Sequence, residues 1–203
     1  DGMKEKVLVG YFVFDYKSNS LQKSPLKFGY VAMGKTPNTA LVTDYEAKGM
    51  GLINCITNKY IIEPILEFAE TIYGTNFFNA EKKDQKGVFD FSGKEIVPLG
   101  IYDTINFNFY RDTIPIFNVC KERKWGCIDS GGKIVVPVIF DNEIMYQNEM
   151  WAIKDGKWGC IDNTLKQIVD FKFDTAYYGN FEMNRYSKGF TCNVNQNQKL
   201  NFN

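Results

Sequence analysis

The residues of this chain that could do chemistry occur twice, in the same setting. The hexapeptide Lys-Trp-Gly-Cys-Ile-Asp fills residues 124–129 and again residues 157–162. A cysteine can serve as a nucleophile, and two carboxylates can share acid and base roles when the environment raises one pKa. The residues to weigh for catalysis are therefore Cys127, Cys160, Asp129 and Asp162.

Two features argue against an enzyme. The chain contains no histidine, which is the usual base for a cysteine nucleophile and a ligand in many zinc sites. The two cysteines also share a repeat position that Leu52 and Val88 hold elsewhere, as expected of small buried hydrophobic residues. We therefore predict no catalytic residue, no metal and no cofactor. A carboxylate- or tyrosine-based hydrolase is the enzymatic alternative that remains.

The hexapeptide is the best-preserved part of a longer repeat. Its glycine recurs in "QKGVFD" at residues 85–90 and in "GMGLIN" at residues 49–54. The spacings are 36, 39 and 33 residues, and periods of this length indicate a repeat architecture. The glycines that anchor the four copies are Gly51, Gly87, Gly126 and Gly159.

Each copy predicts a strand through its glycine, a turn, a second strand, a loop and a third strand, because short β-branched and aromatic runs alternate with turn formers. The turn opens at an acid or amide whose side chain can bond the backbone ahead of it. Proline should end the second strand, because it cannot donate to a ladder. The turn residues are Asn54, Asp90, Asp129 and Asp162, the prolines are Pro64, Pro98 and Pro137, and the aromatic that follows is Phe68, Tyr102, Phe140 or Phe173.

The predicted fold is all-β, an array of about five repeated antiparallel units of three to four strands. Residues 40–180 would form four repeats behind an atypical N-terminal β cap at residues 1–39. Residues 181–203 would form a partial fifth repeat or C-terminal cap, with residues 188–192 in place of the glycine motif. The sheets could close as a small propeller or stack as an open, twisted array, and the drift in spacing favours the open form.

Residues 124–141 and 157–174 resemble the WG-repeat family, also called KWG repeats, and residues 87–103 are a third copy. The resemblance implies an all-β repeat array with a binding or scaffolding role, and it supplies no catalytic centre. Trp125 and Trp158 could stack on a ligand, but their equivalent places favour packing onto the next strand. Met50 and Lys86 replace the tryptophan in the other two copies.

An aromatic beside small polar residues recurs in the predicted loop between the second and third strands. If the repeats stack in register, these loops line one rim, and tyrosine with asparagine and glycine suits adaptable recognition. The alternative is that each ring packs beneath its loop. The predicted rim residues are Tyr73, Phe107, Tyr146, Tyr177 and Tyr178.

Composition limits the partners. Lys plus Arg and Asp plus Glu are 24 each, so neither nucleic acid nor an anionic membrane is indicated. No segment approaches the roughly 18 apolar residues of a membrane span. Five cysteines in no disulfide-rich spacing favour a reducing cytoplasm, with export left open. We expect a non-enzymatic scaffold that binds protein, with carbohydrate or cell-envelope binding through the loop tyrosines as the alternative.

Overall fold

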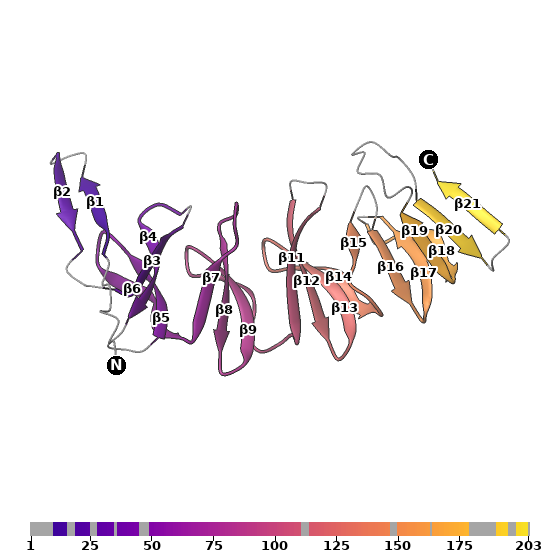
Figure 1. Cartoon of the computed structure of the whole chain (residues 1–203), viewed down its shortest axis with the longest axis horizontal. Coiled ribbons are helices and arrows are strands. Elements are labelled where there is room, and N and C mark those ends of the chain that lie inside the picture. The colour runs from indigo at the N-terminus through magenta and orange to yellow at the C-terminus, as the bar shows by residue number, and fades with distance from the viewer. Residues whose placement is uncertain are drawn as a thin grey trace, which may run out of the picture. The chain divides into compact units, whose positions relative to one another are not determined.

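The computed structural model describes residues 10–15, 19–24, 28–34, 36–44, 49–110, 114–146, 150–162, 164–178, 190–194 and 198–202. The regular elements in these ranges are β-strands joined by turns (Figure 1). This part of the chain contains no helix that could cross a membrane. Contacts divide the chain into two compact units, residues 1–102 and 103–203.

Consecutive antiparallel strands form each sheet, as the sequence predicts. The sheet of the first repeat contains β3 (Tyr30–Met33), β4 (Thr39–Asp44), β5 (Gly49–Asn54) and β6 (Lys59–Leu66). The second contains β7 (Phe68–Thr71), β8 (Phe77–Lys82), β9 (Gln85–Asp90) and β10 (Glu95–Val97). The third contains β11 (Thr104–Tyr110), β12 (Ile114–Lys121), β13 (Lys124–Asp129) and β14 (Ile134–Phe140). The fourth contains β15 (Met145–Tyr146), β16 (Met150–Lys154), β17 (Lys157–Ile161) and β18 (Gln167–Phe173).

Two smaller sheets complete the described residues. β19 (Thr175–Tyr178), β20 (Phe190–Val194) and β21 (Gln198–Phe202) form a three-stranded sheet, and β1 (Phe12–Asp15) pairs with β2 (Ser20–Lys23). The predicted all-β fold of repeated antiparallel units with three to four strands is therefore confirmed, and each sheet is open.

The first strand of each later sheet lies where the sequence predicts a loop. β7, β11, β15 and β19 each pair with the strand that follows them, so the prediction of a loop over these strands is wrong. These strands carry no glycine motif, and β15 is only two residues long, which leaves little pattern to detect. Each complete repeat consequently has four strands, with the glycine strand third and an outer strand fourth. The glycine strands are β5, β9, β13 and β17, and the outer strands are β6, β10, β14 and β18.

Both ends of the array also differ in detail from the prediction. The predicted boundary after residue 39 falls within β4, whose partner β3 belongs to the region predicted as a cap. In the last sheet, β20 lies between β19 and β21. It therefore occupies the second-strand position rather than the position of the glycine motif, and the prediction for residues 190–192 is wrong. The predicted third strand at residues 181–183 lies outside the described residues.

A bulge in the outer strand faces the glycine in the first, third and fourth repeats. Cys127 lies two positions after Trp125, but its partner Val136 lies four positions before Phe140, the partner of Trp125. The same two extra residues occur between β5 and β6 and between β17 and β18. Because the extra residues crowd the facing strand, that strand must carry a residue without a side chain.

The bulge also accommodates two of the prolines. Pro64 lies within β6 and Pro137 within β14, so the prediction that proline ends these strands is wrong. A bulge leaves some backbone groups unpaired, which removes the penalty for a missing N–H. Only Pro98 follows the end of its strand, β10.

The pairing also corrects the alignment of the first repeat. Leu66 faces Met50 as Phe140 faces Trp125. Leu66 therefore holds the position assigned to Phe68, which lies on β7 and is exposed.

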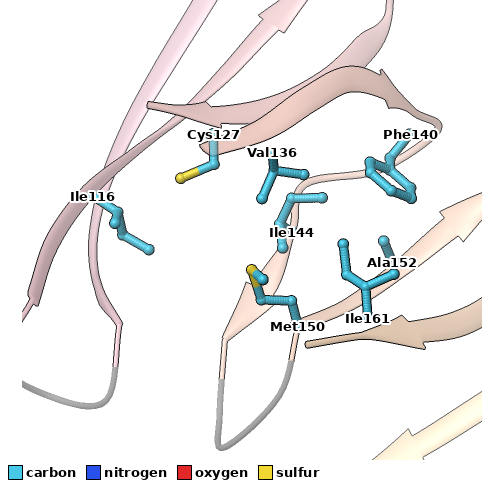
Figure 2. Close-up of a cluster of buried hydrophobic side chains, with 8 residues drawn as sticks. All are labelled: Ile116, Cys127, Val136, Phe140, Ile144, Met150, Ala152 and Ile161. Carbon is cyan, nitrogen blue, oxygen red and sulfur yellow. The ribbon is translucent and has the colours of Figure 1, made fainter. Parts of the chain in front are cut away.

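Within each compact unit, neighbouring four-stranded sheets pack around an apolar layer. In the second compact unit, one layer joins β12, β13 and β14 to β16 and β17 (Figure 2). In the first compact unit, Leu41, Leu52 and Leu66 of one sheet meet Phe78 and Ala80 of the next. The layer of the second unit contains Ile116, Cys127, Val136, Phe140, Ile144, Met150, Ala152 and Ile161. In each of these two pairs, a sheet is stabilised through burial against its neighbour, as in other repeat proteins.

The N-terminal segment covers the other face of the first repeat. Tyr11 and Phe28 are buried there against Ala40, Val42 and Ile53. The two rings stack with their centroids 6.1 Å apart. Without this cover, the apolar face of β4 and β5 would lie open to solvent.

Gly126→Ala should destabilise the fold by about 1–3 kcal/mol, because overpacking forces the backbone to move. A Cβ there would lie 2.6 Å from the carbonyl oxygen of Val136 and 2.8 Å from the carbonyl of Pro137. Gly131→Ala is the matched control, since its Cβ would approach only the Asp129 side chain, at 3.2 Å. Urea unfolding checks both variants. Equal midpoints would show that the bulge tolerates a side chain opposite it.

Candidate functional site

The cysteines of the repeated hexapeptide are buried. Cys127 is 0% exposed in the layer between the third and fourth sheets, and Cys160 is 1% exposed beside Trp151 and Phe173. Each Sγ lies near the carbonyl oxygen of the following residue, at 3.7 and 3.8 Å. Neither thiol is accessible to a substrate in this arrangement, which agrees with the interpretation of both as small hydrophobic residues.

The aspartates of the hexapeptide cap turns. Oδ1 of Asp129 accepts hydrogen bonds from the backbone N–H groups of Gly131 and Lys133, both at 2.9 Å. Oδ1 of Asp162 accepts equivalent bonds from Thr164 and Lys166, at 2.8 and 3.0 Å. A bond from the Thr164 hydroxyl lowers the pKa of Asp162, so this carboxyl is suited to remaining ionised rather than to acting as an acid. The prediction that these side chains bond the backbone ahead is confirmed.

The same capping occurs in the other two repeats. Oδ1 of Asp90 accepts from the N–H groups of Ser92 and Lys94. Oδ1 of Asn54 accepts from Ile56 and Thr57 at 2.9 Å, so an uncharged amide can fill this role. The position is structural in all four copies.

The two motif tryptophans are half-buried. Trp158 packs against the buried cluster of Trp151, Cys160, Val169 and Phe173. Trp125 faces Phe140 across the β13–β14 pair. The packing predicted for these indoles is confirmed for Trp158.

The predicted rim residues occupy two kinds of position. Tyr73 lies in the turn after β7 and is 97% exposed. Phe107 lies within β11, half-buried, with its ring centroid 5.5 Å from that of Phe117. Tyr146, Tyr177 and Tyr178 lie on β15 and β19, and their side chains are outside the described part of the structure.

Four exposed isoleucines, two in each compact unit, lie at recurring positions of the outer strands, which the sequence pattern does not reveal. Ile65 and Ile139 each precede the residue that closes the bulge, and they are 52% and 44% exposed. Ile61 and Ile168 each precede the residue that faces Leu52 or Cys160, and they are 39% and 52% exposed. These four are called the outer-strand isoleucines. The bulge decides which residues of the outer strand face solvent. The sequence shows only an apolar run and does not show where the bulge lies.

Asp141 joins the third and fourth sheets. Its carboxylate bonds the ammonium of Lys124 on β13, and its Oδ2 accepts from the N–H of Gly156 in the β16–β17 turn at 2.8 Å. Its own N–H donates to the carbonyl of Ile153 at 2.7 Å. The bond from Lys124 and then the bond from Gly156 lower the pKa of Asp141, and the bond to Asp141 raises the pKa of Lys124.

A polar network that is partly buried borders the same layer. Nδ2 of Asn118 donates to Oε1 of Glu143 at 2.9 Å and to the carbonyl of Ile144 at 3.1 Å. Nδ2 of Asn106 donates to Oε2 of Glu143, also at 2.9 Å. Asn118 is buried at the position that Leu41 holds in the first repeat. Both carboxylate oxygens of Glu143 accept a bond from an asparagine of the third sheet. The network therefore holds the third sheet and the segment that leads into the fourth in one relative position.

Asp129→Ala should lower the free energy of unfolding by about 1–2 kcal/mol, because two backbone donors lose their acceptor. Asp129→Asn should cost less, since an amide oxygen can accept the same bonds, as Asn54 does. Denaturant unfolding at neutral pH separates the two variants. An equal loss in both would mean that the charge of Asp129 matters rather than its acceptor oxygen.

Asp141→Asn should reduce stability at neutral pH and remove part of the loss of stability in acid. A carboxyl with a lowered folded pKa contributes stability above its unfolded pKa of about 3.9, and this stability is lost as the pH falls through the folded pKa. The difference between wild type and variant should therefore shrink below about pH 4. Asp155→Asn on the neighbouring turn is the control, measured by urea unfolding at each pH. A difference that does not change with pH would contradict the role assigned to Asp141.

Comparison with solved structures gives only weak likeness. Hsv2 of Kluyveromyces marxianus has a TM-score of 0.37 and 9% identity over 79% of this chain and 54% of that chain. Hsv2 of Kluyveromyces lactis has a TM-score of 0.34 and 8% identity over 90% of this chain and 64% of that chain. This chain spans less than two thirds of either structure, and likeness at this level carries no conclusion about function. No curated protein has a matching sequence.

The family comparison agrees with the repeat. Residues 125–157 and residues 158–199 each match the family model described as "WG containing repeat". Each match begins at the tryptophan of the hexapeptide, and the first spans a glycine strand, its capped turn and its bulged outer strand. Residues 125–199 of this chain therefore match the WG-repeat family, as the resemblance of the hexapeptide implies.

Proposed function

We propose that this chain is a non-enzymatic binding module that holds a protein partner on the surface of its WG-type repeats. The observation that carries the proposal is the exposure of the outer-strand isoleucines at equivalent positions of different repeats. Side chains of this size cost free energy in water, and recurring exposed apolar groups are typical of interaction surfaces. In the second compact unit, a partner that contacts the third and fourth repeats would cover both Ile139 and Ile168.

The absence of an enzymatic role is part of the same proposal. The residues best suited to catalysis have structural roles that account for them, since both cysteines are buried and both aspartates cap turns. The positions are also shared between repeats, whereas an active site requires residues that come together once. A carboxylate-based hydrolase would have to use other residues.

Carbohydrate or cell-envelope binding is the second candidate. Tyr73 supports it, because an aromatic ring that is 97% exposed offers a free face for stacking on a sugar. Tyr146 and Tyr178 would join it if their side chains are presented in the same way. This mode needs the tyrosines but not the outer-strand isoleucines.

The test compares capture by wild type, Ile65→Lys/Ile139→Lys and Tyr73→Ala, each checked for an unchanged unfolding midpoint. Lys172 occupies the equivalent position on β18, so the outer strand accepts lysine there. Leu21→Lys on the N-terminal hairpin is the control for adding a charge at another exposed apolar site. Proteins retained by each bait from extracts are quantified by mass spectrometry, and polysaccharide is measured in the same eluates.

We expect a protein that wild type and Leu21→Lys retain equally and that the double lysine variant loses about tenfold, the effect of introducing charge into an apolar contact. Equal retention by the double variant would contradict binding through the outer-strand isoleucines. Retention of polysaccharide that Tyr73→Ala abolishes would favour the carbohydrate alternative.

A further inference from the structure

Most sheet edges in this protein are protected against pairing with other strands. Natural proteins protect such edges by short strands, charges, prolines and bulges. Among the four-stranded sheets, β10 and β15 are short, β7 carries Glu70, and β6, β14 and β18 are bulged. The remaining edge strand besides β11 is β3, which has no bulge but is only four residues long and so offers a short edge.

β11 has none of these protections. It runs over seven residues, Thr104–Tyr110, with the sequence TINFNFY, which contains no charge and no proline. Its pairing with β12 continues from Thr104 to Tyr110 without a shift of register. β-Branched and aromatic residues favour a pleated strand. Within the described residues, β11 is an edge strand whose only neighbour in the sheet is β12.

The two faces of β11 are already used inside its own repeat unit. Asn106 donates to Glu143 on one face, and Phe107 contacts Phe117 on the other. These contacts hold the strand in place, and in its sheet the outer edge of β11 pairs with no described strand. A partner that adds a strand gains main-chain hydrogen bonds to a prearranged template, at little cost in ordering.

The composition of the strand suits a copy of itself. An antiparallel pair centred on Phe107 places residue 107 opposite its own copy, residue 105 opposite 109, residue 106 opposite 108, and residue 104 opposite 110. No like charges meet in this register, and aromatic and β-branched residues face one another, which are favourable cross-strand pairs. A two-fold axis through this position makes the contact closed, so that it ends at a dimer and does not extend into a fibre.

We propose that β11 is a strand-pairing site at which a second copy of this chain adds its own β11 in antiparallel register. The pair joins two four-stranded sheets into one continuous sheet. This site is separate from the outer-strand isoleucines, so it does not depend on the function proposed above.

The first test is hydrogen–deuterium exchange of the whole chain over a range of concentrations, with sedimentation velocity on the same samples. Dimers should form as the concentration rises, and the amides of residues 104–110 should gain protection in parallel while those of β7 do not. A chain that stays monomeric up to about millimolar concentration overturns the proposal. A dimer whose added protection lies elsewhere overturns it as well.

Charge variants test the register. Asn108→Lys places a lysine in each copy close to the two-fold axis, so like charges repel across the pair, and the dimer should weaken about tenfold. Mixing Asn108→Lys with Asn108→Asp should restore it, because the diagonal charges are then opposite. Glu70→Lys on β7 is the matched control and should leave the dimer unchanged, and the unfolding midpoints show that each variant folds.

A heptapeptide of sequence TINFNFY and a scrambled version of it distinguish a second copy from another extended partner. Competition of the native peptide with the dimer supports the proposal. If the mixed-charge pair does not recover, or if both peptides bind equally while the chain remains monomeric, self-pairing through β11 is contradicted.

Discussion

The close approach between the glycine strand and the bulged outer strand is the constraint on which the first, third and fourth repeats depend. Two extra residues in the outer strand push its backbone toward the facing strand, and only a residue without Cβ leaves room for them. At Gly51 the crowding atom is the carbonyl oxygen of Ile62, and at Gly126 it is that of Val136. At Gly159 the ring of Phe171 fills the space instead, 2.6 Å from an added Cβ. In each of these repeats, an atom of the outer strand occupies the space that a Cβ would need.

The bulge then sets the packing of the layers. Because it adds two residues, it keeps the alternation of faces and returns Phe140 to the side of Trp125 and Cys127. Phe140 is buried there, and its ring lies 5.7 Å from that of Phe171 in the next sheet. The following residue, Asp141, reaches both Lys124 and the turn of the next repeat. One local irregularity therefore places an apolar contact and hydrogen bonds between two sheets.

The sequence predicts the features that depend on local chemistry. The period follows from the glycines, and the turn aspartates follow from their ability to accept bonds from the backbone ahead of them. It does not predict the register of the outer strand, because Pro64 and Pro137 indicate an end where the strand bulges and continues. It also misplaces the aromatic position of the first repeat, where Leu66 rather than Phe68 faces the glycine strand. These errors arise because the register is set by packing between strands.

The candidate site follows the same division. Positions shared by all repeats serve the fold, which is why cysteines and aspartates that suggest chemistry prove to be core and capping residues. Information specific to one repeat lies where the copies differ. The position of Asn118 is held by Leu41 in the first repeat and Asn79 in the second. Of the two asparagines only Asn118 is fully buried, and its amide bonds Glu143 from the next repeat. A sheet without that carboxylate would cover Asn118 with one bond fewer, so this polar pair favours the fourth repeat as the neighbour of the third.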